Sequence, residues 1–390
     1  AVVLLFPMRI RPKAKPLDWV RYKLFASRPT LCGGSVARKP LAIFKAERLG
    51  DFLLAQPAIQ RLIELHGAAN CTLIVSHACR AIADRFFPEV EKVEVALEFS
   101  CGDWNWFEAR RQAEAFSRFH FEKAVCLTHH RKPALWSAWT AIRADKKIGL
   151  VEHPWMLPSE RKVERGHLDV HAPYPRQVSP DGGTCLELEA HAVVLNACGC
   201  GPVSASELRP RLKCSLPRPV AKKPVLGIVP GGSSRLKLLP DELMGMICGQ
   251  LADSRAFDVW LIGDATQRGA LERFRAHLAK MPKMGDVRIC CEWDLKQLEA
   301  GLMHCAAVLS ADTFTAHLAT ALDLPVAVLA AGGQPDVFGP WRNSGHQRWF
   351  THEMDCFGCG WRCVHKTVLC VERIDPCAVS AFLADVFAGL

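Results

Sequence analysis

The chain has 390 residues, of which 49% are hydrophobic and 23% charged, a composition typical of globular proteins and not of disordered or fibrous ones. This length is too great for one ordinary hydrophobic core and favours two domains of about 150 residues each. No apolar run reaches the roughly 20 residues needed to cross a bilayer. The apolar start precedes basic residues instead of following them, so a secretory signal is not expected and we expect a cytoplasmic protein.

The net charge of +9 arises largely in residues 1–40, a basic N-terminal arm in which nine Lys and Arg side chains meet one acid, Asp18. Interleaved aromatic residues would allow this arm to lie on an anionic membrane, which would make the protein peripheral on the inner membrane. A solvated arm packed on the first domain is the alternative. We expect no nucleic-acid partner, because no later segment resembles a nucleic-acid-binding module.

Along the chain, short apolar runs alternate with segments of helical spacing, which predicts an α/β protein with parallel sheets covered by helices on both faces. The first series predicts a Rossmann-like domain over 41–205, with 152–182 as a loop, and the second predicts another over 225–355. The Pro-, Gly- and Lys-rich stretch 206–224 is predicted to link them. The predicted strands are 41–46, 71–76, 123–128, 146–151, 225–230, 257–262, 287–291, 306–310 and 325–330.

The first motif with chemical potential is the turn Arg48-Leu49-Gly50-Asp51, which follows a predicted strand. In open α/β sheets, ligands bind beyond the carboxyl ends of the strands. Asp51 is therefore either a helix N-cap or a carboxylate placed to take a proton from an acceptor hydroxyl.

Two motifs in the second half have the chemistry of anion binding. In the loop 230–240, glycines let the backbone approach phosphate oxygens and basic side chains supply charge, although a solvated turn has the same composition. In 309–326, a helix opens at Asp312 with its first N–H groups unpaired; a plain N-cap at Asp312 and a buried structural His317 are the alternatives. The candidate residues of this anion site, which the resemblance described next makes a donor-binding site, are Ser233, Ser234, Arg235, Lys237, Asp312, Thr313, Phe314, Thr315 and His317.

In order and spacing, these motifs resemble glycosyltransferase family 9, the heptosyltransferase family, over roughly residues 41–390. The family's Arg-x-Gly-Asp turn, Pro-Gly-x-Ser loop with its lysine, and Asp-Ser/Thr helix with its histidine all have counterparts here. So does a later Gly-Pro-Trp, at Gly339-Pro340-Trp341. Two positions depart from the pattern: Leu239 stands where tryptophan is usual, and Phe314 where glycine is usual.

The resemblance implies a GT-B fold, in which two Rossmann-like domains face each other across a cleft, and an inverting transfer that requires no cofactor. Asp51 would be the base, and Lys237 with the N–H groups near Thr313 would hold the departing diphosphate. The donor would be a nucleotide-diphosphate sugar, with ADP-heptose as the first candidate, and the acceptor a glycan, glycolipid or protein. His129, His130 and Arg131 follow a predicted strand and are the candidate acceptor contacts.

The segment 356–390 combines a cysteine motif with a predicted closing helix. Its spacing, C-x2-C-x3-C-x6-C, suits a tetrathiolate zinc or iron site, and resembles a cysteine motif that holds iron in some family members. We expect a structural site; reduced thiols or one disulfide are the alternatives. The four candidate ligands are Cys356, Cys359, Cys363 and Cys370.

Two other classes of function fit the same sequence. A two-lobed protein could bind a nucleotide sugar without turning it over. An epimerase of GT-B type would release a free epimerised sugar and would need no acceptor.

Overall fold

The computed structural model describes residues 37–95, 115–116, 119–129, 133–151, 167–175, 177–178, 184–213, 223–232, 234–254, 256–281, 285–342 and 344–389. The chain divides into two compact units, each described here by itself. Unit 1 comprises Ala1–Ser179 and Leu186–Leu208, and unit 2 comprises Pro180–Cys185 and Arg209–Leu390. Among the helices that the structure describes, none combines the length and the apolar character needed to span a membrane.

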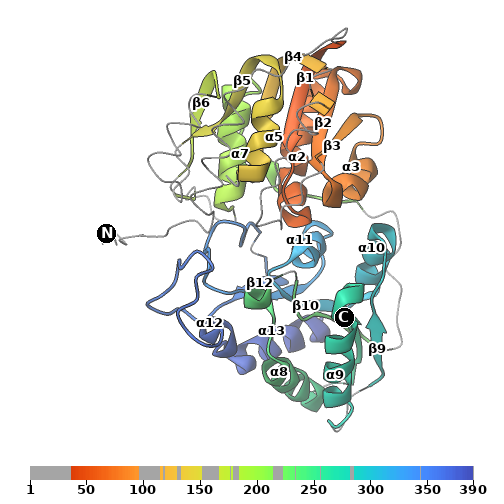
Figure 1. Cartoon of the computed structure of the whole chain (residues 1–390). Helices are drawn as coiled ribbons and strands as arrows, with labels where there is room; N and C mark the ends of the chain where they lie inside the picture. Colours follow the sequence, from red (N-terminus) through yellow and green to blue (C-terminus); the bar gives the residue numbers. More distant parts are fainter. Residues whose placement is uncertain are drawn as a thin grey trace. The chain divides into compact units, whose positions relative to one another are not determined.

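Unit 1 is built on a parallel six-stranded sheet with the strand order β3-β2-β1-β4-β5-β6 (Figure 1). The strands are β1 (Ala37–Lys45), β2 (Cys71–Ser76), β3 (Glu91–Val95), β4 (Phe119–Cys126), β5 (Ala144–Val151) and β6 (Val170–Pro173). The helices are α2 (Leu49–His66), α3 (Arg80–Phe86), α5 (Pro133–Ala141) and α7 (Leu186–Ala197), with short 3-10 turns η1 (Ala68–Asn70), η2 (His77–Cys79) and η3 (Ala205–Leu208).

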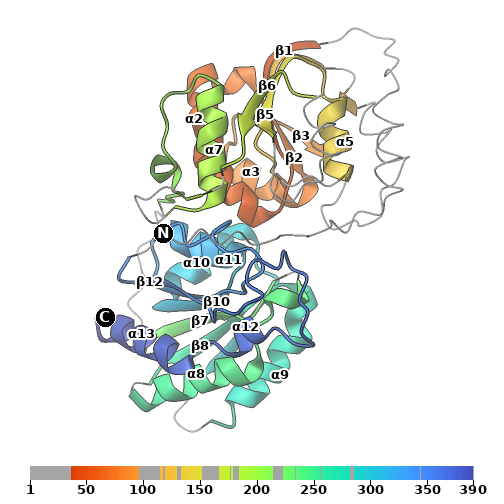
Figure 2. The ribbon, with the colours of Figure 1, turned by 90° about the vertical axis from the view of Figure 1, so that its left-hand side faces the viewer.

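Alternate side chains of the central strand β1 enter two different layers. Phe44 packs against Trp139 of α5, with ring centroids 5.7 Å apart. Lys45, the next residue, lies on the opposite face and bonds Glu187 of α7. Figure 2 shows α5 on one side of the sheet and α2 with α7 on the other. This alternation carries a lysine into the interior beneath α7.

Unit 2 repeats this plan with the strand order β12-β11-β10-β7-β8-β9, again all parallel. The strands are β7 (Val225–Val229), β8 (Asp258–Ile262), β9 (Val287–Cys290), β10 (Ala307–Ala311), β11 (Val326–Leu329) and β12 (Gln347–Phe350). The helices are α8 (Asp241–Ser254), α9 (Arg268–Leu278), α10 (Leu295–His304), α11 (Phe314–Ala321), α12 (Leu369–Glu372) and α13 (Pro376–Ala388), with 3-10 turns η4 (Arg235–Lys237) and η5 (Ala265–Gln267).

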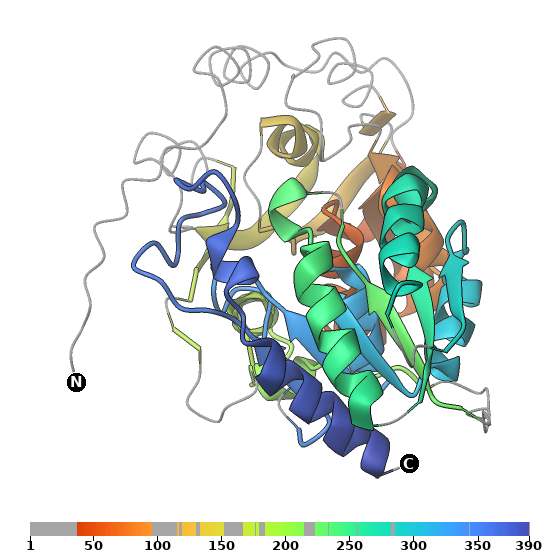
Figure 3. The ribbon, with the colours of Figure 1, turned by 90° about the horizontal axis from the view of Figure 1, so that it is seen from below.

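The helices of unit 2 cover both faces of its sheet. Figures 2 and 3 show α8, α9 and α13 on one face, with α13 alongside α8, and Figure 2 shows α10 and α11 on the other. The apolar side of α13 enters the core with Val379, Leu383 and Phe387, all at most 1% exposed. Two six-stranded parallel sheets with helices on both faces confirm the predicted α/β class.

Three strands, β3, β6 and β12, were missed by the sequence prediction because all three are short and lie at sheet edges. β6 falls inside the stretch 152–182, which was predicted to be a loop, so that prediction is wrong for Val170–Pro173. An edge strand tolerates a proline because it needs no hydrogen bond on its outer side. β12 reads Gln-Arg-Trp-Phe and lacks the apolar run of a central strand.

Candidate functional site

The candidate site of unit 2 forms where two neighbouring parallel strands end. β7 and β10 pair with Val229 opposite Ser310, so the loop after β7 and the start of α11 emerge at the same edge. A Cβ added to Gly232 would lie 3.1 Å from Thr313 Cγ2. Glycine therefore lets the loop backbone approach the residue that precedes α11.

Three predicted residues meet at this edge. The Lys237 ammonium lies 2.7 Å from Asp312 Oδ2, and His317 Nε2 lies 3.5 Å from Asp312 Oδ1. The side chains of Asp312 and His317 are 9% and 5% exposed, while that of Lys237 keeps 20% of its surface in solvent. The lysine is therefore both paired and accessible.

His317 is held from its other side by Trp341, whose indole Nε1–H donates to His317 Nδ1 at 3.0 Å. An indole nitrogen is only a donor, so Nδ1 must be the unprotonated nitrogen of the ring. Neutral His317 then carries its hydrogen on Nε2, facing Asp312. The tryptophan of the Gly-Pro-Trp motif thus sets the histidine tautomer.

Asp312 is ionised in this setting. Burial opposes its negative charge, but the Lys237 ammonium and the His317 hydrogen bond outweigh burial and hold the pKa of the carboxyl well below its usual range. The triad therefore keeps a fixed negative charge at neutral pH, with one ammonium beside it.

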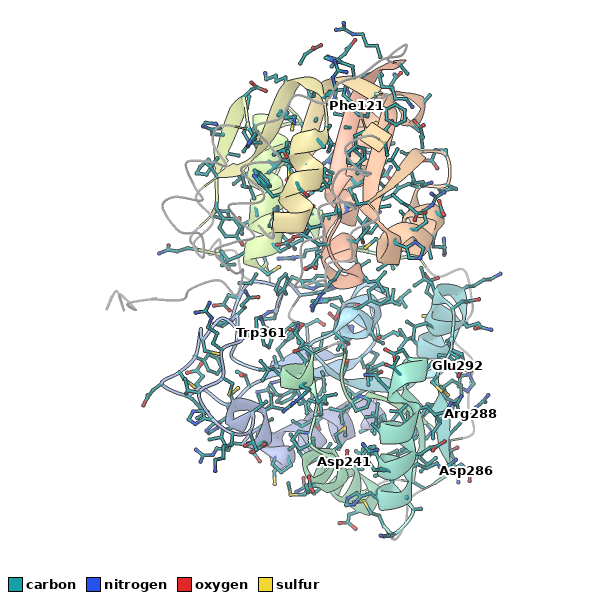
Figure 4. The ribbon with its side chains drawn as sticks, in the orientation of Figure 1. Phe121, Asp241, Asp286, Arg288, Glu292 and Trp361 are labelled. Atoms are coloured by element: carbon teal, nitrogen blue, oxygen red, sulfur yellow. The ribbon has the colours of Figure 1, made fainter. Side chains whose placement is uncertain are left out.

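Aromatic rings shield the lysine of this triad. The Lys237 ammonium lies 4.8 Å from the centre of the Trp361 ring and 5.9 Å from that of Phe338. Trp361, labelled in Figure 4, belongs to the segment that follows β12. Such contacts restrict a flexible lysine without consuming its hydrogen-bond donors.

The other predicted donor-binding residues surround the triad or lie outside the described part. Thr313 precedes α11 as its N-cap residue, and Phe314 and Thr315 open the helix, both half-buried. The Ser234 hydroxyl accepts from Leu236 N at 3.3 Å and so caps η4, whereas Arg235 is exposed. Ser233 lies outside the described residues.

In unit 1, Asp51 occupies the first turn of α2 and is 7% exposed. Its Oδ2 accepts from the backbone N–H of Arg48 at 3.1 Å. One carboxylate oxygen therefore helps to cap the helix. A role as base stays a prediction.

His129 was predicted to contact the acceptor, and the structure places it in a buried cluster of unit 1. Its Nδ1 lies 2.8 Å from Glu187 Oε2, and its backbone N–H donates to Glu47 Oε1 at 2.9 Å. Glu187 also binds the Lys45 ammonium at 2.9 Å. His130 and Arg131 lie outside the described residues, so the structure does not bring the three acceptor candidates together.

The four cysteines of the C-terminal motif line one pocket of unit 2, together with His365. Gly332 N–H donates to Cys370 Sγ at 3.4 Å, and Cys356 Sγ lies 3.7 Å from His365 Nε2. Burial, followed by the neighbouring thiols, raises the pKa of Cys370. All four are free thiols in this structure.

Several residues of these clusters escaped the sequence prediction. Lys45 was visible as a charge at the end of an apolar strand, and Trp341 was noted only as part of a motif. Glu187 and His191 stand four residues apart on α7, a spacing that places both on one helix face. This spacing could be read from the sequence, but no neighbouring residue indicated that Lys45 and His129 would contact the pair.

Comparison with known proteins finds a family match in the second half of the chain. Residues 196–363 match the sequence model of glycosyltransferase family 9 (heptosyltransferase). These residues therefore form a glycosyltransferase family 9 domain. They include the whole Lys237–Asp312–His317–Trp341 network, and the match indicates that the protein is a glycosyltransferase. No curated protein sequence matches the chain.

Solved heptosyltransferases and a solved family 9 glycosyl transferase share the fold of the chain. E. coli ADP-heptose lipopolysaccharide heptosyltransferase II superposes with a TM-score of 0.59 at 19% identity, over 90% of this chain and 99% of the other. A family 9 glycosyl transferase from Veillonella parvula gives 0.64 at 13% identity, over 93% and 100%. E. coli heptosyltransferase WaaC with ADP gives 0.59 at 15% identity, over 90% and 100%. These matches establish the GT-B fold for this chain.

Proposed function

We propose that the protein is an inverting glycosyltransferase that moves a sugar from a nucleotide-diphosphate donor to a hydroxyl of a glycan, glycolipid or protein. The observation that carries this proposal is the Lys237–Asp312–His317 triad at the ends of β7 and β10, inside the family 9 match. ADP-heptose is the first donor to test, because the structures of similar fold include proteins named for ADP-heptose or bound to ADP.

In this proposal, unit 2 holds the diphosphate of the donor. Lys237 has three N–H donors, and one of them faces Asp312, so phosphate oxygens can use the others. The first N–H groups of α11 have no partners within the helix and carry its positive dipole end. Both features stabilise the charge that develops on the departing nucleotide.

Asp51 is the proposed base, and takes the proton of the acceptor hydroxyl as that oxygen attacks the anomeric carbon. The bond from the anomeric carbon to the diphosphate breaks with its electron pair leaving on the phosphate oxygen. Lys45, Glu187 and His191 of unit 1 are not assigned a step in this reaction.

We also propose that Cys356, Cys359, Cys363 and Cys370 hold a structural zinc or iron ion. Their thiols share one pocket, and the N–H donated by Gly332 to Cys370 Sγ is typical of the surroundings of metal thiolates. Gly358 and Gly360 have φ values of +79° and +59° and supply the tight turns between ligands. The ion would brace the segment that carries Trp361.

A cytoplasmic location, with residues 1–40 resting on the inner membrane, completes the proposal. The cysteines in the described part are free thiols, as suits a reducing compartment. Sedimentation with anionic vesicles tests the arm, and binding that persists after residues 1–36 are removed would contradict it.

The first experiment is a donor screen on the full-length protein. Thermal shift and mass spectrometry should show stabilisation by one class of ADP, UDP or GDP sugar, and transfer to a supplied acceptor. Stabilisation by none of them would remove the proposed donor site. Release of a free epimerised sugar without acceptor would instead indicate an epimerase.

A matched variant separates transfer from binding. Asp51→Asn keeps an oxygen that can accept from Arg48 N–H but cannot take a proton at neutral pH. We expect donor affinity within about threefold of wild type, and a loss of transfer of at least 10²-fold, the usual contribution of a general base. Unchanged transfer would mean that Asp51 acts only as a cap.

A further inference from the structure

Unit 1 encloses a cluster of ionisable side chains that the proposed transfer reaction does not explain. Lys45 ends β1, His129 follows the neighbouring strand β4, and Glu187 and His191 lie one turn apart on α7. Relative exposures are 0%, 1%, 2% and 0% in that order. Burying four such groups is costly unless their charges and lone pairs are used.

Three of these side chains have the geometry of a metal site. His129, Glu187 and His191 each offer one ligand atom, and the three atoms lie within 4.8 Å of one another. His129 Nδ1 is 2.8 Å from Glu187 Oε2, and His191 Nε2 is 3.7 Å from Glu187 Oε1. Zinc binds such atoms at about 2.0–2.2 Å, which places tetrahedral ligands about 3.4 Å apart. Small ring rotations would bring the three into that range.

The ring of His191 is fully buried, so its two nitrogens cannot bond to solvent. Neither ring nitrogen of His191 makes a hydrogen bond of normal geometry within the described part. A metal ion bound to one ring nitrogen would offset the free-energy cost of burying that nitrogen without a hydrogen bond.

We propose that His129, Glu187 and His191 bind a zinc ion inside unit 1, with water as the fourth ligand. The surrounding bonds suit this arrangement: Lys45 holds Glu187 Oε1 and leaves Oε2 for the ion, while Glu47 anchors the backbone of His129. The zinc takes the place of the proton shared by His129 and Glu187. Its role is to fasten the end of β4 to α7, and it is independent of sugar transfer.

The test measures zinc by mass spectrometry in the full-length protein. In one background, Cys356, Cys359, Cys363 and Cys370 are changed to Ser, so that thiolates contribute nothing. We expect one zinc per chain to survive dialysis there, and its loss in His129→Ala/His191→Ala. A control pair, His77→Ala/His304→Ala, should retain it. A folded four-serine protein that takes up no zinc would overturn the proposal.

Cobalt substitution of the otherwise wild-type protein covers the case in which the serine variant does not fold. Cobalt on thiolates gives an intense charge-transfer band, whereas cobalt on nitrogen and oxygen gives only visible ligand-field bands. We expect His191→Ala to remove one cobalt per chain and leave the thiolate band unchanged. Unchanged cobalt content in that variant would refute the site. So would ¹⁵N spectra in which His129 keeps its proton when zinc is added.

Discussion

Each unit of the protein places a lysine, a carboxylate and a histidine where its central strands end, yet the two clusters differ in access and charge. In unit 2, Lys237 keeps 20% of its side chain in solvent and faces one carboxylate, Asp312. In unit 1, Lys45 is fully buried and faces Glu47 and Glu187 at once. The two lysines therefore differ in their access to solvent and in the number of carboxylates around them.

The difference explains why the lysine of unit 2 can bind a phosphate from solvent and the lysine of unit 1 cannot. An ammonium that is partly open to solvent and has one carboxylate partner can share its donors with an incoming phosphate at small desolvation cost. A buried ammonium with excess negative charge around it is fixed, since removing either partner exposes an unpaired charge to the interior. We expect the first cluster to govern activity and the second to govern stability.

The largest effect on stability should come from Lys45→Met. The change leaves two buried carboxylates without their shared cation, which typically costs about 3–5 kcal/mol in the free energy of unfolding. Urea denaturation at pH 7 measures it. The exposed Arg38–Asp145 pair provides the control, because Arg38→Met should cost less than about 1 kcal/mol. Equal losses in the two variants would contradict the expected contrast between a buried and an exposed ion pair.

Activity should fall most in Lys237→Met. Losing one donor to the departing diphosphate typically lowers transfer about 10²–10³-fold, and donor affinity should fall with it. Steady-state transfer and calorimetric donor binding measure the two effects. Lys296→Met removes an exposed lysine of α10 and should change neither. Wild-type transfer in Lys237→Met would assign the diphosphate to other groups.

The sequence predicted the fold well because the core strands are buried on both faces. Runs such as Leu-Ala-Ile-Phe at 41–44 are fully buried in the structure, and such runs carry a strong signal. The edge strands β6 and β12 have only a weak strand signal in the sequence. The predicted linker 206–224 contains the point, after Leu208, at which the two units divide.

The clusters were harder to predict because their contacts are distant in sequence. Lys45 and Glu187 are 142 positions apart, and Lys237 and Asp312 are 75 apart. Local spacing cannot reveal such pairs. The family resemblance supplied the second pair through its motifs, but the first has no counterpart among the motifs that were recognised. Buried charge networks follow from the packing of helices on the sheet, which periodicity alone does not determine.

Acid stability should distinguish the two clusters further. The folded pKa of Asp312 is depressed, so its contribution to stability is present above the unfolded pKa of about 3.9 and is lost as pH falls through the folded pKa. Asp312→Asn should therefore reduce the free energy of unfolding by about 1–3 kcal/mol at pH 7, and by progressively less below about pH 4. Denaturant titrations across that range measure it. A pH-independent difference would mean that the carboxylate charge does not stabilise the triad.

The smallest effect, and the most specific, should come from Trp341→Phe. The change keeps an aromatic ring and removes the N–H that donates to His317 Nδ1, at a cost of about 1 kcal/mol in the free energy of unfolding. Its larger consequence is chemical, because Nδ1 loses the donor that fixes the tautomer of the ring. ¹⁵N spectra should show the lost tautomer preference. Trp349→Phe, at a ring distance of 6.1 Å from His317, should leave the tautomer unchanged. If Trp341→Phe and Trp349→Phe had the same effect on the His317 tautomer, Trp341 would contribute only packing. Asp312 would then keep its charge without a fixed tautomer of His317 beside it.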